Sequence, residues 1–186
     1  MNEYFFNQLY FLHQATTNNL ILSLGLINSQ LVYILTNFIM EVHVIAVGKS
    51  NDNEINQLVD RYSKRIAQFT KFQFHVLGQD SKGQRLNRRM TKLNKNAFFI
   101  SLDSTGQQLS SREFADLLKS KTNHSYNKII FLIGGPFGLL SEPPRQTHLS
   151  LSFSKMTLTH QLIRVILLEQ IYRAFTIIGN HPYHHG

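Results

Sequence analysis

From Met40 onwards, the spacing of apolar and polar residues predicts a regular succession of strands and helices. The stretch EVHVIAVG, residues 41–48, is typical of a strand that ends at a glycine. Residues 53–69 have apolar positions three and four residues apart, which predicts an amphipathic helix. Further strands are predicted at residues 72–77, 97–103, 128–134 and 149–153.

Two more helices complete the pattern. Ser110 with Glu113 three residues later is a capping box, and it predicts a helix that runs to about Lys121. An apolar run from His160 to Ile178 predicts a long closing helix, and the third strand is expected to break at residues 104–106. Strands that alternate with helices predict an α/β fold with a mainly parallel sheet and helices on both faces. In such sheets, ligands bind beyond the carboxyl ends of the strands.

The first 39 residues differ from the rest, with one acid, no Lys or Arg and no sustained period. Residues 20–40 are apolar enough for a membrane span to be considered, but polar residues interrupt them and no basic flank orients them. A signal peptide would need a positively charged start and a small-residue cleavage site, and neither is visible. We expect residues 40–186 to form the functional domain and residues 1–39 to be upstream sequence included by the choice of start codon. A weak membrane anchor is the alternative.

Charge is distributed unevenly along the chain. The net charge of +8 indicates a polyanionic partner, either nucleic acid or an anionic membrane surface. No Lys or Arg precedes Lys49, whereas residues 80–96, DSKGQRLNRRMTKLNKN, contain six of them. A solvated helix face would explain such a run equally well. The absence of cysteine excludes disulfides and thiolate chemistry and suits a reducing compartment, so we expect the protein in the cytoplasm.

Two loops that follow predicted strands carry candidate ligand-binding chemistry. GGPFG, residues 134–138, follows the fourth strand, and its glycines permit close backbone approach to a ligand. The loop matches neither the dinucleotide-binding nor the Walker pattern, so a tight connection is the alternative. SFSKMTLTHQ, residues 152–161, follows the fifth strand and offers short polar side chains. We expect the two strands to be neighbours, which would bring both loops together around a cofactor.

The segments IGGPFGL, LSFSKMTLTHQLIRVILLEQIYRAF and NHPYH together resemble the bacterial 23S rRNA pseudouridine-N3 methyltransferase family, a branch of the SPOUT methyltransferases. The resemblance covers residues 40–186. It implies a trefoil knot in the C-terminal half of the domain, a homodimer, and S-adenosylmethionine as the cofactor. The implied substrate is N3 of a pseudouridine in helix 69 of large-subunit rRNA, on the assembled ribosome.

The resemblance also implies which residues hold the cofactor, mainly through their backbone. They are Leu102 at the end of the third strand, Gly134 in the glycine loop, and the run Phe153, Ser154, Lys155, Met156, Thr157 and Leu158. Two positions depart from the family pattern: Phe137 stands where an acidic or polar residue is common, and His185 stands where a basic residue is common. These departures keep two rival functions open, an RNA-binding ribosome-assembly protein without catalysis and a SPOUT methyltransferase acting on another RNA.

The chain ends in NHPYHHG, which places three histidines among the last six residues. The spacing of His181, His184 and His185 would suit zinc, but no Cys is available and no second shell is evident, so we expect no metal. Methyl transfer requires the acceptor nitrogen to lose a proton, and we expect His184 to assist this, with Tyr183 stacking or hydrogen-bonding beside it. Packing of the chain end is the alternative role for both. We expect this tip beside the cofactor site of its own or the partner subunit.

Two arginines lie in the apolar closing helix. An arginine in such a stretch needs a carboxylate, a phosphate or a carbonyl as its partner. Glu169 stands four residues before Arg173, which predicts a structural salt bridge. Arg164 has no acid at that spacing, and we expect it to contact the substrate or a subunit interface as part of the catalytic machinery.

Overall fold

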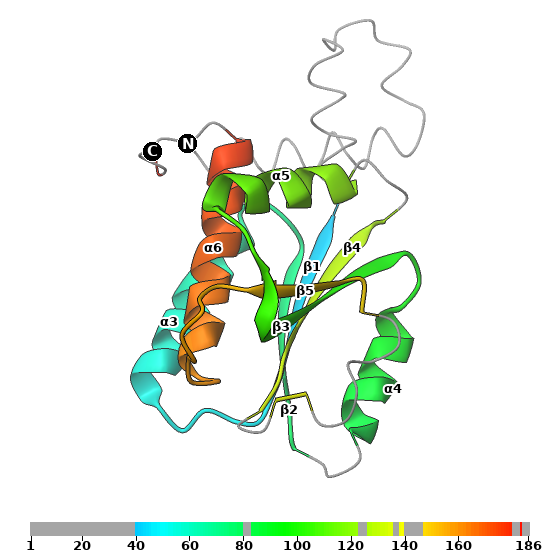
Figure 1. The fold of residues 1–186 in the computed structure, drawn as a ribbon, viewed down its shortest axis with the longest axis vertical. Helices are drawn as coiled ribbons and strands as arrows, with labels where there is room; N and C mark the ends of the chain where they lie inside the picture. The colour runs from blue at the N-terminus through cyan, green and yellow to red at the C-terminus, as the bar shows by residue number, and fades with distance from the viewer. Residues whose placement is uncertain are drawn as a thin grey trace, which may run out of the picture. The chain divides into compact units, whose positions relative to one another are not determined.

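A computed structural model describes residues 40–79, 83–122, 126–135, 138–139, 147–179 and 183. Five parallel strands form one sheet in the order β2-β1-β4-β3-β5 (Figure 1). The strands are β1 (Glu41–Val47), β2 (Phe72–Leu77), β3 (Ala97–Gln108), β4 (Lys128–Ile133) and β5 (Leu149–Ser152). The helices are α3 (Asn53–Ile66), α4 (Gln84–Leu93), α5 (Ser111–Thr122) and α6 (Leu162–Ile178). The predicted α/β class with a parallel sheet is confirmed.

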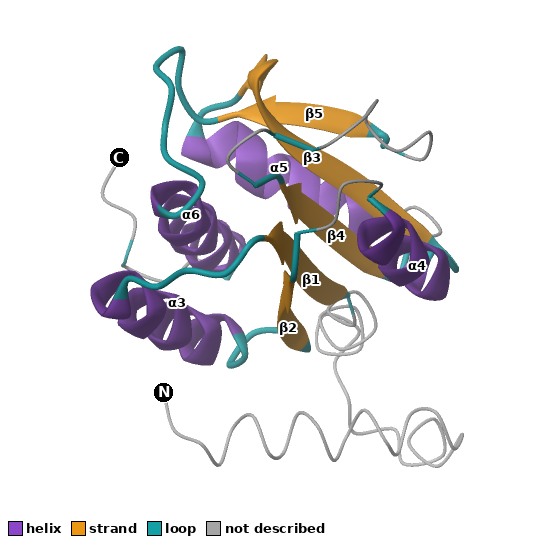
Figure 2. Cartoon of the chain, turned by 90° about the horizontal axis from the view of Figure 1, so that it is seen from below, coloured by secondary structure: helices purple, strands orange, loops and turns teal. Residues whose placement is uncertain are grey.

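Helices cover both faces of the sheet, as predicted. Among the described helices, α4 lies alone on one face, whereas α3, α5 and α6 cover the other (Figure 2). Leu132 of β4 packs in one cluster with Met90 of α4. Phe131, the preceding residue, contacts the ring of Phe114 in α5, because successive side chains of a strand point to opposite faces. One face is therefore covered by a single short helix.

The capping box predicted for α5 is confirmed. The backbone N–H of Ser110 donates to the Glu113 carboxylate at 2.7 Å, and the N–H of Glu113 donates to the Ser110 hydroxyl at 3.2 Å. A similar bond begins α3, where the N–H of Ile55 donates to the Asp52 carboxylate at 3.0 Å. Each cap satisfies backbone donors that the first helical turn leaves without partners.

The predicted break in the third strand is wrong, because β3 continues beyond residues 104–106. Leu102 and Gln107 both stand opposite Leu151 of β5, so the residues between them form an irregularity within the strand. A Cβ atom on Gly106 would collide with the backbone of Leu151. Glycine at this position therefore lets β5 approach and resume its pairing with β3, instead of ending the strand.

The strand order corrects a second expectation, that the fourth and fifth strands are neighbours. β3 lies between β4 and β5 and pairs with both. Pairing between strands far apart in the sequence depends on the tertiary fold, which local periodicity does not encode. The end of β3 consequently lies between the two loops that follow β4 and β5.

Helix α6 runs antiparallel to the strands. Near its start, the Arg164 guanidinium bonds to the carbonyl of Gly48, directly after the carboxyl end of β1. Near its end, the ring of Phe175 stacks on Phe69, which shortly precedes the amino end of β2. α6 packs against both α3 and α5. No helix in the described part of the chain is both long enough and apolar enough to cross a membrane.

Candidate active site

The carboxyl ends of three adjacent strands bring the predicted cofactor-binding residues to one edge of the sheet. Gly134 directly follows β4, and residues 153–158 directly follow β5. Leu102 lies in β3, at the point where its regular pairing with β5 is interrupted. Because all strands are parallel, these positions share one edge, where ligands bind in open α/β sheets.

The glycine loop is a closely packed backbone turn. Gly135 and Gly138 exchange two backbone hydrogen bonds of 3.0 and 2.9 Å. A Cβ atom on Gly134 would collide with the backbone of Gly138, so any other residue there would displace the turn. A Cβ atom on Gly135 would lie 3.7 Å from the Val47 carbonyl oxygen and 3.9 Å from the side chain of Gln79. The loop therefore packs against the ends of β1 and β2.

The loop after β5 is shaped by its own hydroxyl groups. The Ser152 hydroxyl donates to the carbonyl of Ser154 at 2.8 Å, and the Ser154 hydroxyl accepts the N–H of Met156 at 2.9 Å. Met156 is 76% exposed, Lys155 is exposed and Leu158 is half-buried. The apolar side chains of Met156 and Leu158 and the exposed cation of Lys155 suit S-adenosylmethionine, which combines an aromatic base with a charged amino-acid end. The residues present thus fit the cofactor.

Arg164 connects this loop to the end of β1 through hydrogen bonds. Its side chain is 2% exposed, and Nε donates to the carbonyl of His160 at 3.1 Å. Nη2 donates to the carbonyls of Gly48 at 2.8 Å and Val47 at 3.3 Å. Burial lowers the pKa of this guanidinium from its usual value. Carbonyls are one of the three partner types expected for an arginine in this helix, and contact with substrate or an interface stays a prediction.

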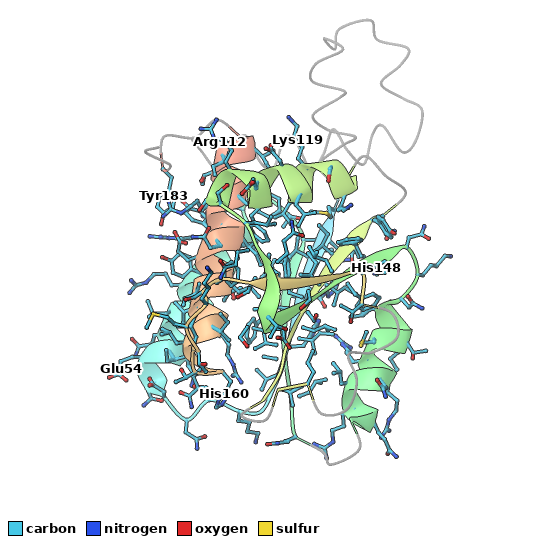
Figure 3. All side chains as sticks on the ribbon, in the orientation of Figure 1. Glu54, Arg112, Lys119, His148, His160 and Tyr183 are labelled. Carbon is cyan, nitrogen blue, oxygen red and sulfur yellow. The ribbon has the colours of Figure 1, made fainter. Side chains whose placement is uncertain are left out.

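Tyr183 lies beside the middle of α6. Its phenol donates to the Glu169 carboxylate at 3.4 Å, and its ring packs edge-on against Tyr172 with centroids 4.8 Å apart. Burial, followed by the neighbouring Tyr62, raises the pKa of this phenol. Tyr183 and His160 lie towards opposite ends of α6 (Figure 3). Within one protomer, Tyr183 therefore lies away from the loop after β5.

A family model described as predicted SPOUT methyltransferase matches residues 40–184. The chain belongs to the SPOUT methyltransferase family. Proteins called ribosomal RNA large subunit methyltransferase H are similar to it, with identities of 40% in Acholeplasma laidlawii, 36% in Bacillus cytotoxicus and 33% in Christiangramia forsetii. Each match covers 78% of this chain and 99% of the relative. These relatives confirm the family that the motifs indicated.

The salt bridge predicted in the closing helix of this SPOUT methyltransferase is confirmed. Glu169 accepts hydrogen bonds from Arg173 at 2.6 and 3.0 Å. The Arg173 guanidinium also lies over the ring of Tyr183, 5.0 Å from its centroid.

Four predicted or discussed positions lie outside the described residues, namely Phe137, His181, His184 and His185.

The sequence patterns did not predict a polar cluster that lies beneath α4 and includes His43 and His75. His43 is buried, and its ring bonds to His75 and to Glu41, at 3.2 Å in each case. Nη2 of Arg89 in α4 lies 2.9 Å from Nδ1 of His75. Burial, then Arg89 and His43, lowers the pKa of His75 to about 4. A histidine inside an otherwise apolar strand could have indicated such a buried polar cluster.

This cluster offers no metal site. Within the described ranges of the SPOUT methyltransferase, no three or more His, Cys, Asp or Glu side chains are placed to hold a metal ion. The three histidines of the terminal NHPYHHG segment lie outside those ranges.

Proposed function

We propose that this chain is an S-adenosylmethionine-dependent 23S rRNA methyltransferase that methylates N3 of a pseudouridine in helix 69 of large-subunit rRNA. The observation that carries the proposal is the meeting of Leu102, Gly134 and residues 153–158 at one edge of the sheet, in a chain of the SPOUT family. The name shared by its relatives supports ribosomal RNA as the substrate. The proposed reaction takes place in the cytoplasm, on the assembled ribosome.

The cofactor would be held by Leu102, Gly134 and the backbone of residues 153–158. When bound, it supplies an electrophilic methyl group. The protein's main task is then to hold the acceptor nitrogen in line with that group, because displacement at a methyl carbon depends on alignment. Arg164 contributes indirectly, since its bond to the His160 carbonyl fixes the loop two residues after Leu158.

The acceptor nitrogen must lose a proton, because the imino group of a pseudouridine is protonated at neutral pH. We assign assistance in this step to His184, because an imidazole side chain is suited to accepting a proton. The raised pKa of Tyr183 keeps its phenol protonated. Tyr183 is therefore suited to stacking or to donating a hydrogen bond, and not to removing the proton.

We also propose a homodimer in which the C-terminal tip of one subunit completes the site of the other. α6 is apolar nearly all round, and Leu162 is 43% exposed while Val165 and Ile166 are half-buried. A helix with apolar residues on every side is normally buried on every side, which favours a second copy against α6. The position of Tyr183 beside the middle of α6, away from the loop after β5, supports delivery of the tip to a partner. The proposed dimer includes the trefoil knot that the family implies.

Residues 40–186 form the functional domain in this proposal, and residues 1–39 lie outside it. The family match supports the boundary, because it begins at residue 40. Mass spectrometry of the native protein's N-terminus tests the start site. A native peptide spanning Ile39 and Met40 would contradict translation from Met40.

Calorimetric titration with S-adenosylmethionine, followed by mass mapping of modified nucleotides on ribosomes from cells with and without the gene, tests the activity. We expect binding, and a methyl group on the helix 69 pseudouridine that disappears with the gene. The Gly134→Ala variant should lose cofactor binding, because its Cβ atom collides with the glycine turn. Absence of cofactor binding would favour the rival function of a non-catalytic ribosome-assembly protein. A methyl group at another nucleotide would indicate another RNA substrate.

A further inference from the structure

The outer face of α4 carries exposed cations, and no residue of this helix is acidic. Leu86 and Met90 face the sheet and are buried, whereas Arg88 and Lys92 are exposed. Lys95, just after the helix, is also exposed. In the part of the chain that the structure describes, these three cations form no ion pair. We propose that this face, Arg88, Lys92 and Lys95, binds the phosphodiester backbone of the RNA that carries the target nucleotide.

The charge pattern of α4 differs from that of the other surface helices. α3 has Glu54 in its first turn, and its Lys64 pairs with Asp60 at 2.7 Å. α5 likewise has Glu113 in its first turn. α4 has no acid in its first turn, where Arg85 stands instead and opposes the helix dipole, whereas Lys92 in its last turn is favourable.

Two further features make α4 costly as a solvated helix. Arg88 and Lys92 are like charges four residues apart, which destabilises an isolated helix. Gly83 precedes the helix and provides no side-chain cap. A mixed-charge face would solvate the helix equally well without these costs. A row of phosphates would offset the repulsion between these cations, since it neutralises them.

The position of α4 links this face to the cofactor edge. The Arg85 guanidinium lies against Gly78, which follows the carboxyl end of β2. The next residue, Gln79, lies beside Gly135 of the glycine loop. The amino end of α4 therefore lies near the glycine loop, and the cations of its outer face lead away from there. An RNA strand whose target base enters the site would pass along this helix.

The face is also compatible with the proposed homodimer. α4 and α6 cover opposite faces of the sheet (Figure 2). A second copy that packs on α6 consequently leaves α4 open. Each subunit of a dimer would present its own α4 to RNA.

This inference rests on the proposed function, and a binding measurement separates the two. The probe is a fluorescein-labelled RNA hairpin with the helix 69 sequence, and its anisotropy is followed over a range of KCl concentrations with the full-length protein. The test variant is the double change Arg88→Gln and Lys92→Gln. The control is Arg61→Gln, an exposed cation of α3 on the other face of the sheet. Calorimetry with S-adenosylmethionine and thermal melting verify that each variant is folded.

Each phosphate contact contributes a slope of about 0.7–0.9 in the plot of log affinity against log salt. We expect the double variant to lower that slope by about 1.5, with unchanged cofactor affinity and an unchanged or higher melting temperature. The control should retain the wild-type slope. A double variant with the slope of the control would overturn the role of α4 while leaving the proposed function intact. A wild-type protein that binds neither the RNA nor the cofactor would overturn both proposals.

Discussion

At the scale of single residues, Arg164 shows how one buried side chain supports the proposed site. It belongs to α6, yet its guanidinium bonds to carbonyls on both sides of the site, at Gly48 and at His160. No carboxylate balances its charge among the bonds that the structure describes. Carbonyl dipoles do so instead, which makes the guanidinium a positioning group for the loop after β5.

Replacement of Arg164 by Met should therefore affect both stability and cofactor binding. Partly buried carbonyls would lose their donor, so we expect a loss of about 1–3 kcal/mol in the free energy of unfolding. Chemical denaturation measures this loss. The conservative Arg164→Lys variant keeps the charge but cannot reach both carbonyls in the same geometry. It should fold and raise the Kd for S-adenosylmethionine about tenfold, or ~1.4 kcal/mol.

Arg173→Met is the matched control on the same helix. Its salt bridge with Glu169 is partly exposed, and such pairs contribute a few tenths of a kcal/mol. Equal destabilisation by the Arg164→Met and Arg173→Met variants would contradict a positioning role for Arg164.

At the scale of elements, the contact between α4 and the sheet is sensitive to acid. Arg89 of α4 faces the ring of His75 in β2, and the pKa of that histidine is lowered to about 4 from its ordinary 6.5. Protonation would place a second cation beside Arg89. Between these two values the unfolded chain binds more protons than the folded one, so stability falls as the pH falls.

The free energy of unfolding, measured by denaturant titration from about pH 7 down to about pH 4, should therefore decrease towards acid. His75→Gln removes the titrating ring and keeps a hydrogen-bonding side chain, so the decrease should become shallower. His148→Gln is the comparison variant: burial also lowers the pKa of His148, whose ring accepts the N–H of Phe99, but this change leaves the contact under α4 intact, so its effect on the pH dependence should be smaller. An unchanged pH dependence in the His75→Gln variant would show that this contact is not the acid-sensitive one.

Local sequence patterns predicted the helices and strands better than they predicted which strands pair. The capping box at Ser110 and the bridge from Glu169 to Arg173 lie within single helices, so their spacing alone was sufficient. The placement of β3 between β4 and β5, and the bond from His43 to His75, join residues distant in the sequence. Both depend on how strands associate, which periodicity does not specify.

The candidate site shows the same division. Its location at the carboxyl ends of the strands followed from the α/β pattern, and the identity of its residues followed from the family motifs. The burial of Arg164 against backbone carbonyls did not follow from either, because the sequence could only require that a partner exist.

At the scale of the whole molecule, the course of α6 bears on whether one subunit can complete its own site. Tyr183 contacts Glu169 and Tyr172, about two to three helical turns after the start of α6, which is about 10–15 Å along the axis. The proposed cofactor loop lies before that start. A tip that serves catalysis is thus better placed to reach a second subunit.

Mixed dimers test this arrangement. A His184→Ala subunit keeps its cofactor site, and a Gly134→Ala subunit keeps its tip, so neither homodimer should methylate rRNA. When the two are co-expressed and purified through two different tags, a composite site predicts one working site in each mixed dimer. Methyl transfer to ribosomes from gene-deleted cells is the measurement. An inactive mixed dimer, with a wild-type and His184→Ala mixture still active, would contradict the composite site.

The antiparallel return of α6 leaves the domain with its two attachment points on the same side. Met40 precedes β1, and Ile178 ends α6, both at the amino edge of the sheet. The opposite edge, with the glycine loop and the loop after β5, is built entirely from internal segments. The chain after Ile178 therefore starts from the edge opposite the proposed cofactor site of its own subunit.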